Sequence, residues 1–304
     1  MKPFLSSVAL SILVCCPVIA FAQIPDPGAR DRIVVSAAWL AQHVADRDLV
    51  LLHVGNKDTY DAGHIAGARH VDFRTTLAAG EAANGLTLEM LPADVLHDRL
   101  AALGISDASR IVVYQSDDLW TPSTRVMLTL DYAGLSNVSW LDGGLKAWMA
   151  AGHQLSSEVS TVKAGTLSPL TLRTIVVDAD FVKAHLATPA FAIVDARATA
   201  FYDGTRTGGR APNEHKAGHI AGAFTAPYDS FTSADVRLKP AEEIAAVFTR
   251  AGVKPGDTVI GYCHIGQQAT AMLFAARTLG YRVLLYDGSF EDWSKRNLPV
   301  EKVR

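Results

Sequence analysis

The segment Ala62-Gly-His64-Ile-Ala-Gly67-Ala68 occurs twice in this chain, the second time as Ala217-Gly-His219-Ile-Ala-Gly222-Ala223. Two other segments recur in the same order, Leu100–Ile105 as Phe248–Val253 and Leu141–Trp148 as Tyr286–Trp293. Solenoid proteins stack several short repeats, whereas here one long unit occurs only twice. The repeats therefore indicate a duplicated domain.

Each copy alternates short apolar runs with helical patterns. The expected strands are Leu49–Val54, Arg110–Tyr114 and Val138–Leu141 in the first copy, and Ala192–Asp195, Thr258–Tyr262 and Arg282–Tyr286 in the second. The expected helices of the second copy are Ala241–Ala251 and Thr270–Leu279. Such alternation is typical of a parallel sheet covered on both faces. The predicted fold class is α/β, with two tandem domains, each a mostly parallel sheet flanked by helices on both faces.

Length and composition agree with two globular domains. The chain has 304 residues, of which 49% are hydrophobic and 19% charged, with a formal net charge of −3. There is no basic excess, so nucleic acid is not expected as a partner. We expect domains at residues 31–155 and 173–301. They are joined by a linker at residues 156–172, which is rich in Ser, Thr, Gly and Pro.

The N-terminus has the pattern of a secretory signal peptide. Lys2 is followed by the mostly apolar run Val8–Ile19 and the cleavage pattern Ala20-Phe-Ala22. The apolar run is too short for a membrane span. We expect residues 1–22 to be removed, leaving a periplasmic or secreted protein with no membrane attachment.

Removal of this leader leaves Cys263 as the single cysteine, because Cys15 and Cys16 lie within it. Cys263 follows the apolar run Thr258–Tyr262 and precedes Gly266 and a helical pattern. Backbone N–H groups and a helix N-terminus at that position favour a thiolate, which is the nucleophilic form. A lone thiol in an exported protein is either an inert buried side chain or a reactive group.

Comparison of the two copies favours the reactive interpretation. Tyr262-Cys263 aligns with Tyr114-Gln115, and the first-copy loop after it carries Asp117 and Asp118. Negative charge there would repel both a thiolate and an anionic substrate. The second copy alone has Asp195-x-Arg197 and a basic insertion containing Arg206, Arg210, His215 and Lys216.

These residues resemble the tandem rhodanese (sulfurtransferase) family over about residues 31 to 300. The resemblance rests on the paired Gly-His-Ile-x-Gly-Ala segments, Asp195-x-Arg197, the Cys-x-x-Gly-x-x-Ala loop at 263–269, and the Asp-Gly…Trp end of each copy. It implies that Cys263 takes sulfane sulfur from a donor as a persulfide and passes it to a thiophilic acceptor, such as cyanide or a thiol. No cofactor or metal is implied beyond that covalent intermediate.

The resemblance also implies roles for individual residues. Arg197 would bind the anionic donor, and Arg210 matches a second arginine of some members. The loop residues would surround the sulfur: His264, Ile265, Gly266, Gln267, Gln268 and Ala269. Thiosulfate-specific members often carry a cation where this chain has Ile265. The expected donor is thiosulfate, with 3-mercaptopyruvate as the alternative.

Several residues also have structural interpretations. His64 and His219 occur in both copies and are expected to stabilise a turn, while Trp148 and Trp293 are expected in the core. Asp195 either orients Arg197 or makes turn hydrogen bonds. For Arg210 a surface charge and a functional role are equally good interpretations, and for Arg206 a surface charge is the better one.

His264 is expected to be an exposed loop residue. Tuning of the cysteine pKa and general acid catalysis remain alternatives for it.

Three other functions compete with sulfur transfer. A cysteine phosphatase would need an arginine at the position of Ala269. A persulfide carrier without turnover and a purely structural role are the other two. A monomer is expected.

Overall fold

The computed structural model describes residues 26, 28–79, 85–210 and 213–303. The predicted signal peptide at residues 1–22, with Cys15 and Cys16, lies outside these residues. Within the described part, no helix is long and apolar enough to cross a membrane.

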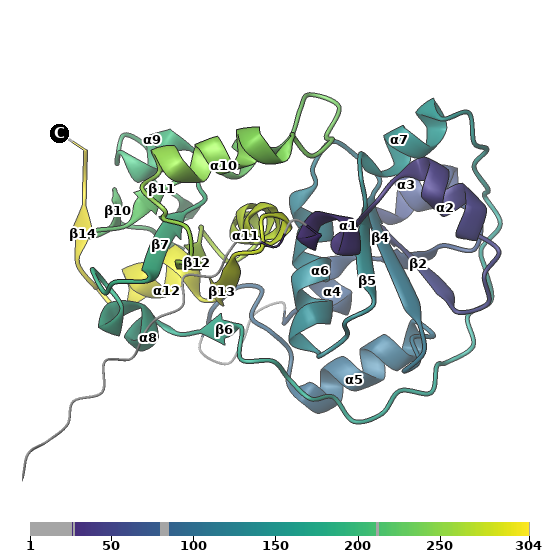
Figure 1. The fold of residues 1–304 in the computed structure, drawn as a ribbon. Coiled ribbons are helices and arrows are strands. Elements are labelled where there is room, and N and C mark those ends of the chain that lie inside the picture. Colours follow the sequence, from purple (N-terminus) through teal and green to yellow (C-terminus); the bar gives the residue numbers. More distant parts are fainter. Residues whose placement is uncertain (1–25, 27, 80–84, 211–212, 304) are drawn as a thin grey trace, which may run out of the picture.

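Two five-stranded sheets form the framework, and all strand pairs within them are parallel. The first has the order β1 (Val34–Val35), β5 (Val138–Leu141), β4 (Arg110–Gln115), β2 (Leu49–Val54) and β3 (Arg69–Val71). The second has the order β6 (Val176–Val177), β13 (Arg282–Tyr286), β12 (Thr258–Tyr262), β7 (Phe191–Asp195) and β11 (Phe224–Thr225). Corresponding strands take the same place in each sheet, which confirms the predicted α/β duplication (Figure 1).

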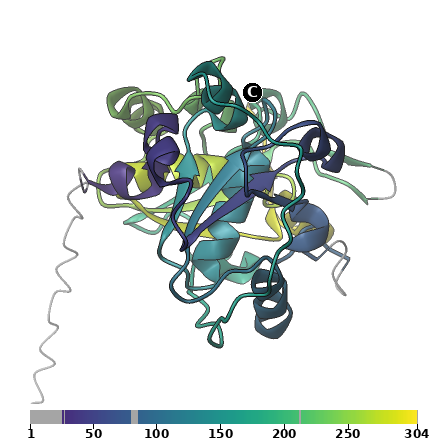
Figure 2. The same ribbon diagram turned by 90° about the vertical axis from the view of Figure 1, so that its right-hand side faces the viewer.

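Helices cover both faces of each sheet because side chains alternate along the strands. In the first half, Leu51 packs with α2 (Ala37–His43) and α7 (Gly144–Ala150). Leu52, on the other face, belongs to the core that includes α5 (Ala93–Ala102) and α6 (Thr121–Tyr132). Figure 2 views the first half in front of the second, with helices on either side of its sheet.

The second half repeats this arrangement. Ile193 and Ile260 pack with α8 (Ala179–Ala184) and α12 (Ser289–Lys295). The opposite face packs against α10 (Ala241–Arg250) and α11 (Gln268–Thr278). The remaining short elements are α1 (Ala29–Ile33), α3 (Lys57–Ala62), α4 (Phe73–Thr76), α9 (Thr199–Tyr202), β8 (Gly209–Arg210), β9 (Asn213–Glu214), β10 (His219–Ile220), β14 (Val300–Glu301) and a 3-10 turn at Tyr228–Phe231.

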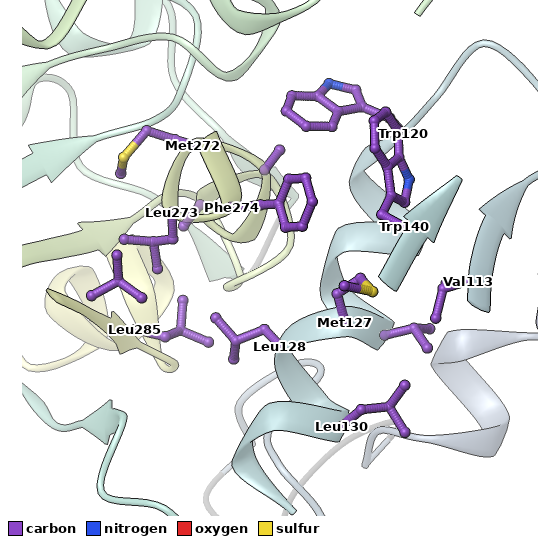
Figure 3. Close-up of a cluster of buried hydrophobic side chains, with 14 of the residues drawn as sticks. Val113, Trp120, Met127, Leu128, Leu130, Trp140, Met272, Leu273, Phe274 and Leu285 are labelled. Atoms are coloured by element: carbon purple, nitrogen blue, oxygen red, sulfur yellow. The ribbon is translucent and has the colours of Figure 1, made fainter. Parts of the chain in front are cut away.

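The two halves share one continuous apolar core. Helices α6 and α11 lie between the sheets and pack against each other (Figures 1 and 3). Phe274 of α11 contacts the first-half rings of Trp120 and Trp140, with centroids 6.5 and 5.6 Å apart. Thr124 and Thr270 add a hydrogen bond of 3.0 Å between the helices. The halves therefore form one packed unit.

The predicted linker has no helix or strand between residues 157 and 173. It lies against the first half through backbone hydrogen bonds, from Gly165 to Ala101 at 2.8 Å and from Asp107 to Thr166 at 3.2 Å.

Candidate active site

Cys263 lies at the carboxyl edge of the second sheet. Strand β12 is buried throughout and ends at Tyr262, which pairs with Asp195 at the end of β7. Cys263 follows at once and is fully buried, and α11 begins at Gln268. Side chains at adjacent carboxyl ends of parallel strands converge, and this is the usual location of sites in open α/β sheets.

Three carbonyl groups of the 263–267 loop accept hydrogen bonds from residues outside the loop. Cys263 O accepts from Phe290 N and His264 O accepts from Glu291 N, each at 3.0 Å. The Gly266 carbonyl accepts from Arg125 Nη1 at 3.2 Å. The N–H groups of Ala269, Ile265 and Gln268 donate to the Cys263 sulfur. A ring of donors of this kind stabilises negative charge.

Gly266 makes this turn possible. Its φ is +79°, and a Cβ there would lie 2.8 Å from Asp287 O and 3.0 Å from Arg125 Nη1. Only glycine adopts such a conformation at so close an approach without strain.

The ionisation of Cys263 differs from the sequence-based expectation. Burial raises the pKa of the thiol, while the N–H groups of Ala269, Ile265 and Gln268 act in the opposite direction. The expected donors are present, but loss of hydration outweighs them, because burial penalises the charged form. The N–H groups therefore favour the thiolate as predicted, and the burial that outweighs them was not predicted from the sequence.

A cavity of about 250 Å³ opens beside the cysteine. It is lined by residues of both halves: Leu119, Thr121, Tyr228, Cys263, His264, Ile265, Gln267 and Gln268. Four of the predicted loop residues, His264, Ile265, Gln267 and Gln268, thus border one space with the nucleophile. Leu119, Thr121 and Tyr228 were missed, because they belong to distant segments and carry no chemical motif.

Arg197 lies two residues beyond the end of β7 and is buried, with 1% of its surface exposed. Its Nε and Nη2 donate to the Asp195 carboxylate, with Nη2 to Oδ2 at 2.6 Å, and Nη2 also donates to Gly218 O at 2.7 Å. The guanidinium Cζ lies 3.9 Å from the centroid of the Phe290 ring. Both alternatives for Asp195 are present, because its carboxylate orients the Arg197 guanidinium and its Oδ1 also accepts a turn hydrogen bond from Arg197 N at 2.9 Å. Donor binding by Arg197 stays a prediction.

The basic insertion reaches the site through its histidine rather than through Arg210. Arg210 is exposed on the short strand β8 and is not among the residues that line the cavity. His215 Nδ1 lies 3.4 Å from His264 Nδ1. A Cβ on Gly208 would lie 2.4 Å from His264, so the insertion packs tightly on that ring.

His264 is half-buried, which corrects the expectation of an exposed loop histidine. Its ring meets Phe201 edge-on at 4.5 Å between centroids. Burial, followed by Arg197, His215 and Arg206, lowers its pKa to about 3. His264 is therefore a neutral side chain at neutral pH.

The paired motifs have the structural roles predicted for them. His64 Nδ1 is hydrogen-bonded to Tyr60 O, and His219 Nδ1 to Tyr202 O, both at 2.8 Å. Trp148 and Trp293 are buried. In the first half, Gln115 replaces the cysteine, and its Oε1 accepts from Trp140 Nε1 at 3.0 Å. Among the described residues, no group of three or more His, Cys, Asp or Glu side chains is arranged to hold a metal ion.

Fold and site together define a two-domain α/β protein with a buried cysteine in a loop of inward-facing N–H groups. The profile of the rhodanese-like domain matches residues 36–151 and 178–296. The chain belongs to the rhodanese-like domain family, as the motifs predicted.

Comparison with named proteins agrees with this family. Thiosulfate sulfurtransferase of Rattus norvegicus is 30% identical over 290 residues, covering 90% of this chain and 95% of the rat protein. A probable 3-mercaptopyruvate sulfurtransferase of Pseudomonas aeruginosa is 29% identical, covering 86% of this chain and 94% of that protein. The wild-type structure of EanB has a TM-score of 0.78 at 24% identity, over 91% of this chain and 70% of that one. At that identity it supports the fold alone.

Proposed function

We propose that this protein is a sulfurtransferase that carries sulfane sulfur as a persulfide on Cys263. The observation that carries the proposal is the loop itself, in which the N–H groups of Ala269, Ile265 and Gln268 converge on the sulfur beside an open cavity. A phosphatase is disfavoured because Ala269 stands where an arginine would grip phosphate.

The reaction has two steps on one sulfur atom. The Cys263 thiolate attacks the outer sulfur of thiosulfate, a new S–S bond forms, and sulfite leaves with the electron pair of the broken bond. Cyanide or a thiolate then attacks the outer sulfur of the persulfide and releases the Cys263 thiolate. The loop N–H groups stabilise the charge on sulfur in both steps.

Thiosulfate is the donor that we propose first, since several relatives are named thiosulfate sulfurtransferases. The alternative, 3-mercaptopyruvate, is favoured by one observation: the described residues lining the cavity include neither lysine nor arginine. A dianion gains less in such a site than a singly charged donor does. Arg197 would attract either anionic donor by long-range electrostatics, although its positive charge is partly balanced by Asp195.

We also propose that the mature protein acts outside the cytoplasm as a monomer after removal of residues 1–22, and that it needs no metal or organic cofactor. The signal-peptide pattern supports the location, and the covalent chemistry available to Cys263 supports the absence of a cofactor.

Thiocyanate formation from each donor with cyanide, in wild type and Cys263→Ser, tests the function. We expect wild type to turn over and the serine variant to lose at least about 10³-fold in kcat, because it has no sulfur nucleophile. After donor treatment without acceptor, the mass of wild type should increase by one sulfur atom. A wild type that gains this sulfur but forms no thiocyanate would identify a carrier. An active serine variant would disprove the mechanism.

A further inference from the structure

Residues of the first half form hydrogen bonds with the 263–267 loop of the second half, which carries Cys263. Arg125 of α6 is 1% exposed, and its Nη1 donates to Gly266 O at 3.2 Å and to Asp287 Oδ1 at 2.6 Å. Its Nη2 donates to Leu88 O. This guanidinium therefore connects a helix of one half, a loop of the same half and the catalytic loop of the other.

Asp287 completes this connection. Its Oδ2 accepts from Met90 N at 2.8 Å, so both carboxylate oxygens are bound by the first half. Asp287 itself belongs to the repeated Asp-Gly segment that leads into α12. The amides of the following residues Phe290 and Glu291 bind the carbonyls of Cys263 and His264. Arg125 thus binds the loop directly, at Gly266, and its partner Asp287 precedes the segment whose amides bind the loop at Cys263 and His264.

The geometry of the peptide bond explains why these contacts matter for sulfur. In a trans peptide the C=O of one residue and the N–H of the next point in opposite directions. Because Glu291 N binds His264 O, the Ile265 N–H is directed to the Cys263 sulfur. In the same way, the bond from Arg125 to Gly266 O fixes the orientation of the peptide group between Gly266 and Gln267, which leads into the N–H groups of Gln268 and Ala269 that act on the sulfur.

We propose that Arg125 is a positioning residue of the sulfur-transfer site: by holding the Gly266 carbonyl outward, it keeps the loop N–H groups directed at the sulfur of Cys263. Two more first-half contacts act on the next residue. Thr121 Oγ1 accepts from Gln267 Nε2 at 2.9 Å, and Arg74 Nη2 donates to Gln267 Oε1 at 3.1 Å. The first domain, which has no nucleophile, thereby fixes the conformation of the loop that carries Cys263. This inference rests on the proposed role of Cys263.

The test compares variants that leave no unpaired buried charge. Removing Arg125 alone would strand the Asp287 carboxylate, which is strongly destabilising. We therefore combine Arg125→Met with Asp287→Asn, whose amide oxygen can still accept from Met90 N. Arg125→Lys retains a cation with a single nitrogen, which cannot bind all three acceptors of the guanidinium at once. Arg277→Met is the matched control, since it removes a different ion pair between the halves, Arg277 Nη1 to Asp131 Oδ2 at 3.2 Å, and leaves Asp131 paired with Arg173.

Two readouts separate positioning from folding. The first is the pH titration of thiolate absorbance, measured as the difference from Cys263→Ser in each background. The second is kcat/KM for thiosulfate with cyanide. For the double variant we expect a thiol midpoint about one pH unit higher and a kcat/KM about tenfold lower. Arg125→Lys should fall between, and Arg277→Met should titrate like wild type.

A double variant that folds and titrates like wild type would overturn the proposal. So would an Arg277→Met variant with the same shift, because the effect would then come from any loosening between the halves. The titration is read on the resting protein and needs no turnover. Absence of sulfur transfer in wild type would therefore refute the proposed function and leave the test of Arg125 intact.

Discussion

Asp195 and His53 occupy the same position in the two copies, Asp195 paired with Tyr262 and His53 with Tyr114 on the neighbouring strand. Asp195 carries a charge that Arg197 balances within the interior. His53 is also fully buried, and its Nε2 has no hydrogen-bond partner among the described residues. Burial, followed by His70 and His64, lowers its pKa to about 3. One strand end therefore supports an ion pair, and the other holds a neutral ring.

This buried ring predicts acid sensitivity of the fold. In the unfolded chain a histidine binds a proton below about pH 6.5, whereas folded His53 stays neutral until about pH 3. Between these values the unfolded state binds more protons, so stability falls as the pH is lowered. The slope is up to about 1.4 kcal/mol per pH unit for each such group. His264 contributes in the same direction.

Urea unfolding at several pH values between 7 and 4, in wild type and His53→Gln, measures this effect. We expect the slope for the variant to be smaller by about one proton equivalent, whatever its stability at neutral pH. Equal slopes in the two proteins would show that His53 is protonated in the folded state.

At the scale of elements, each central strand is tied to the Gly-His-Ile turn by a tyrosine hydroxyl. Ile220 N donates to Tyr262 Oη at 3.1 Å, and Ile65 N donates to Tyr114 Oη at 3.2 Å. The duplicated motif thus has one structural purpose in both halves. Cys263 follows one of these tyrosines directly, and the other precedes Gln115.

The two tyrosines form a matched pair for mutation. We expect Tyr262→Phe and Tyr114→Phe each to lower the free energy of unfolding by about 1–3 kcal/mol, because each leaves a buried N–H unpaired. Only Tyr262→Phe should also lower kcat/KM, since it alone adjoins the nucleophile. Chemical unfolding and thiocyanate assays check both points. Equal loss of activity in both variants would contradict this assignment.

The central strands were predicted to within one residue because they are buried on both faces and read as continuous apolar runs. The edge strands β1, β3, β6 and β11 were not predicted, since each has only two or three residues. Helix α11 begins two residues earlier than predicted, at Gln268. Glutamine gives no start signal by itself, and the beginning of this helix is set by the turn at Gly266.

In the molecule as a whole, the two halves share one apolar core, and we expect this contact to make them unfold as one cooperative unit. Phe274 lies between Trp120, Trp140 and the core of the second half (Figure 3). The cavity beside Cys263 has walls from both halves. Stability and the shape of the site therefore depend on the same interface.

Phe274→Ala should lower the free energy of unfolding by about 3–5 kcal/mol, as expected for truncating a buried aromatic side chain. Calorimetry should show one transition in both wild type and variant, displaced to lower temperature in the variant. Leu128→Ala, in the same core, serves as a comparison from the first half. Two separate transitions in wild type would show that the halves unfold independently.

The duplicated α/β fold, its central strands and the candidate nucleophile Cys263 followed from the sequence by itself, because repeats, apolar runs and a glycine turn are local patterns. The contacts between the halves and the ionisation of the site residues depend on the tertiary structure. Arg125 and Gly266 are 141 positions apart, and no local pattern predicts their hydrogen bond. The raised pKa of the thiol and the neutral state of His264 depend on burial. Hydration is lost only when the whole chain has packed, so the electrostatics of the site belong to the folded molecule.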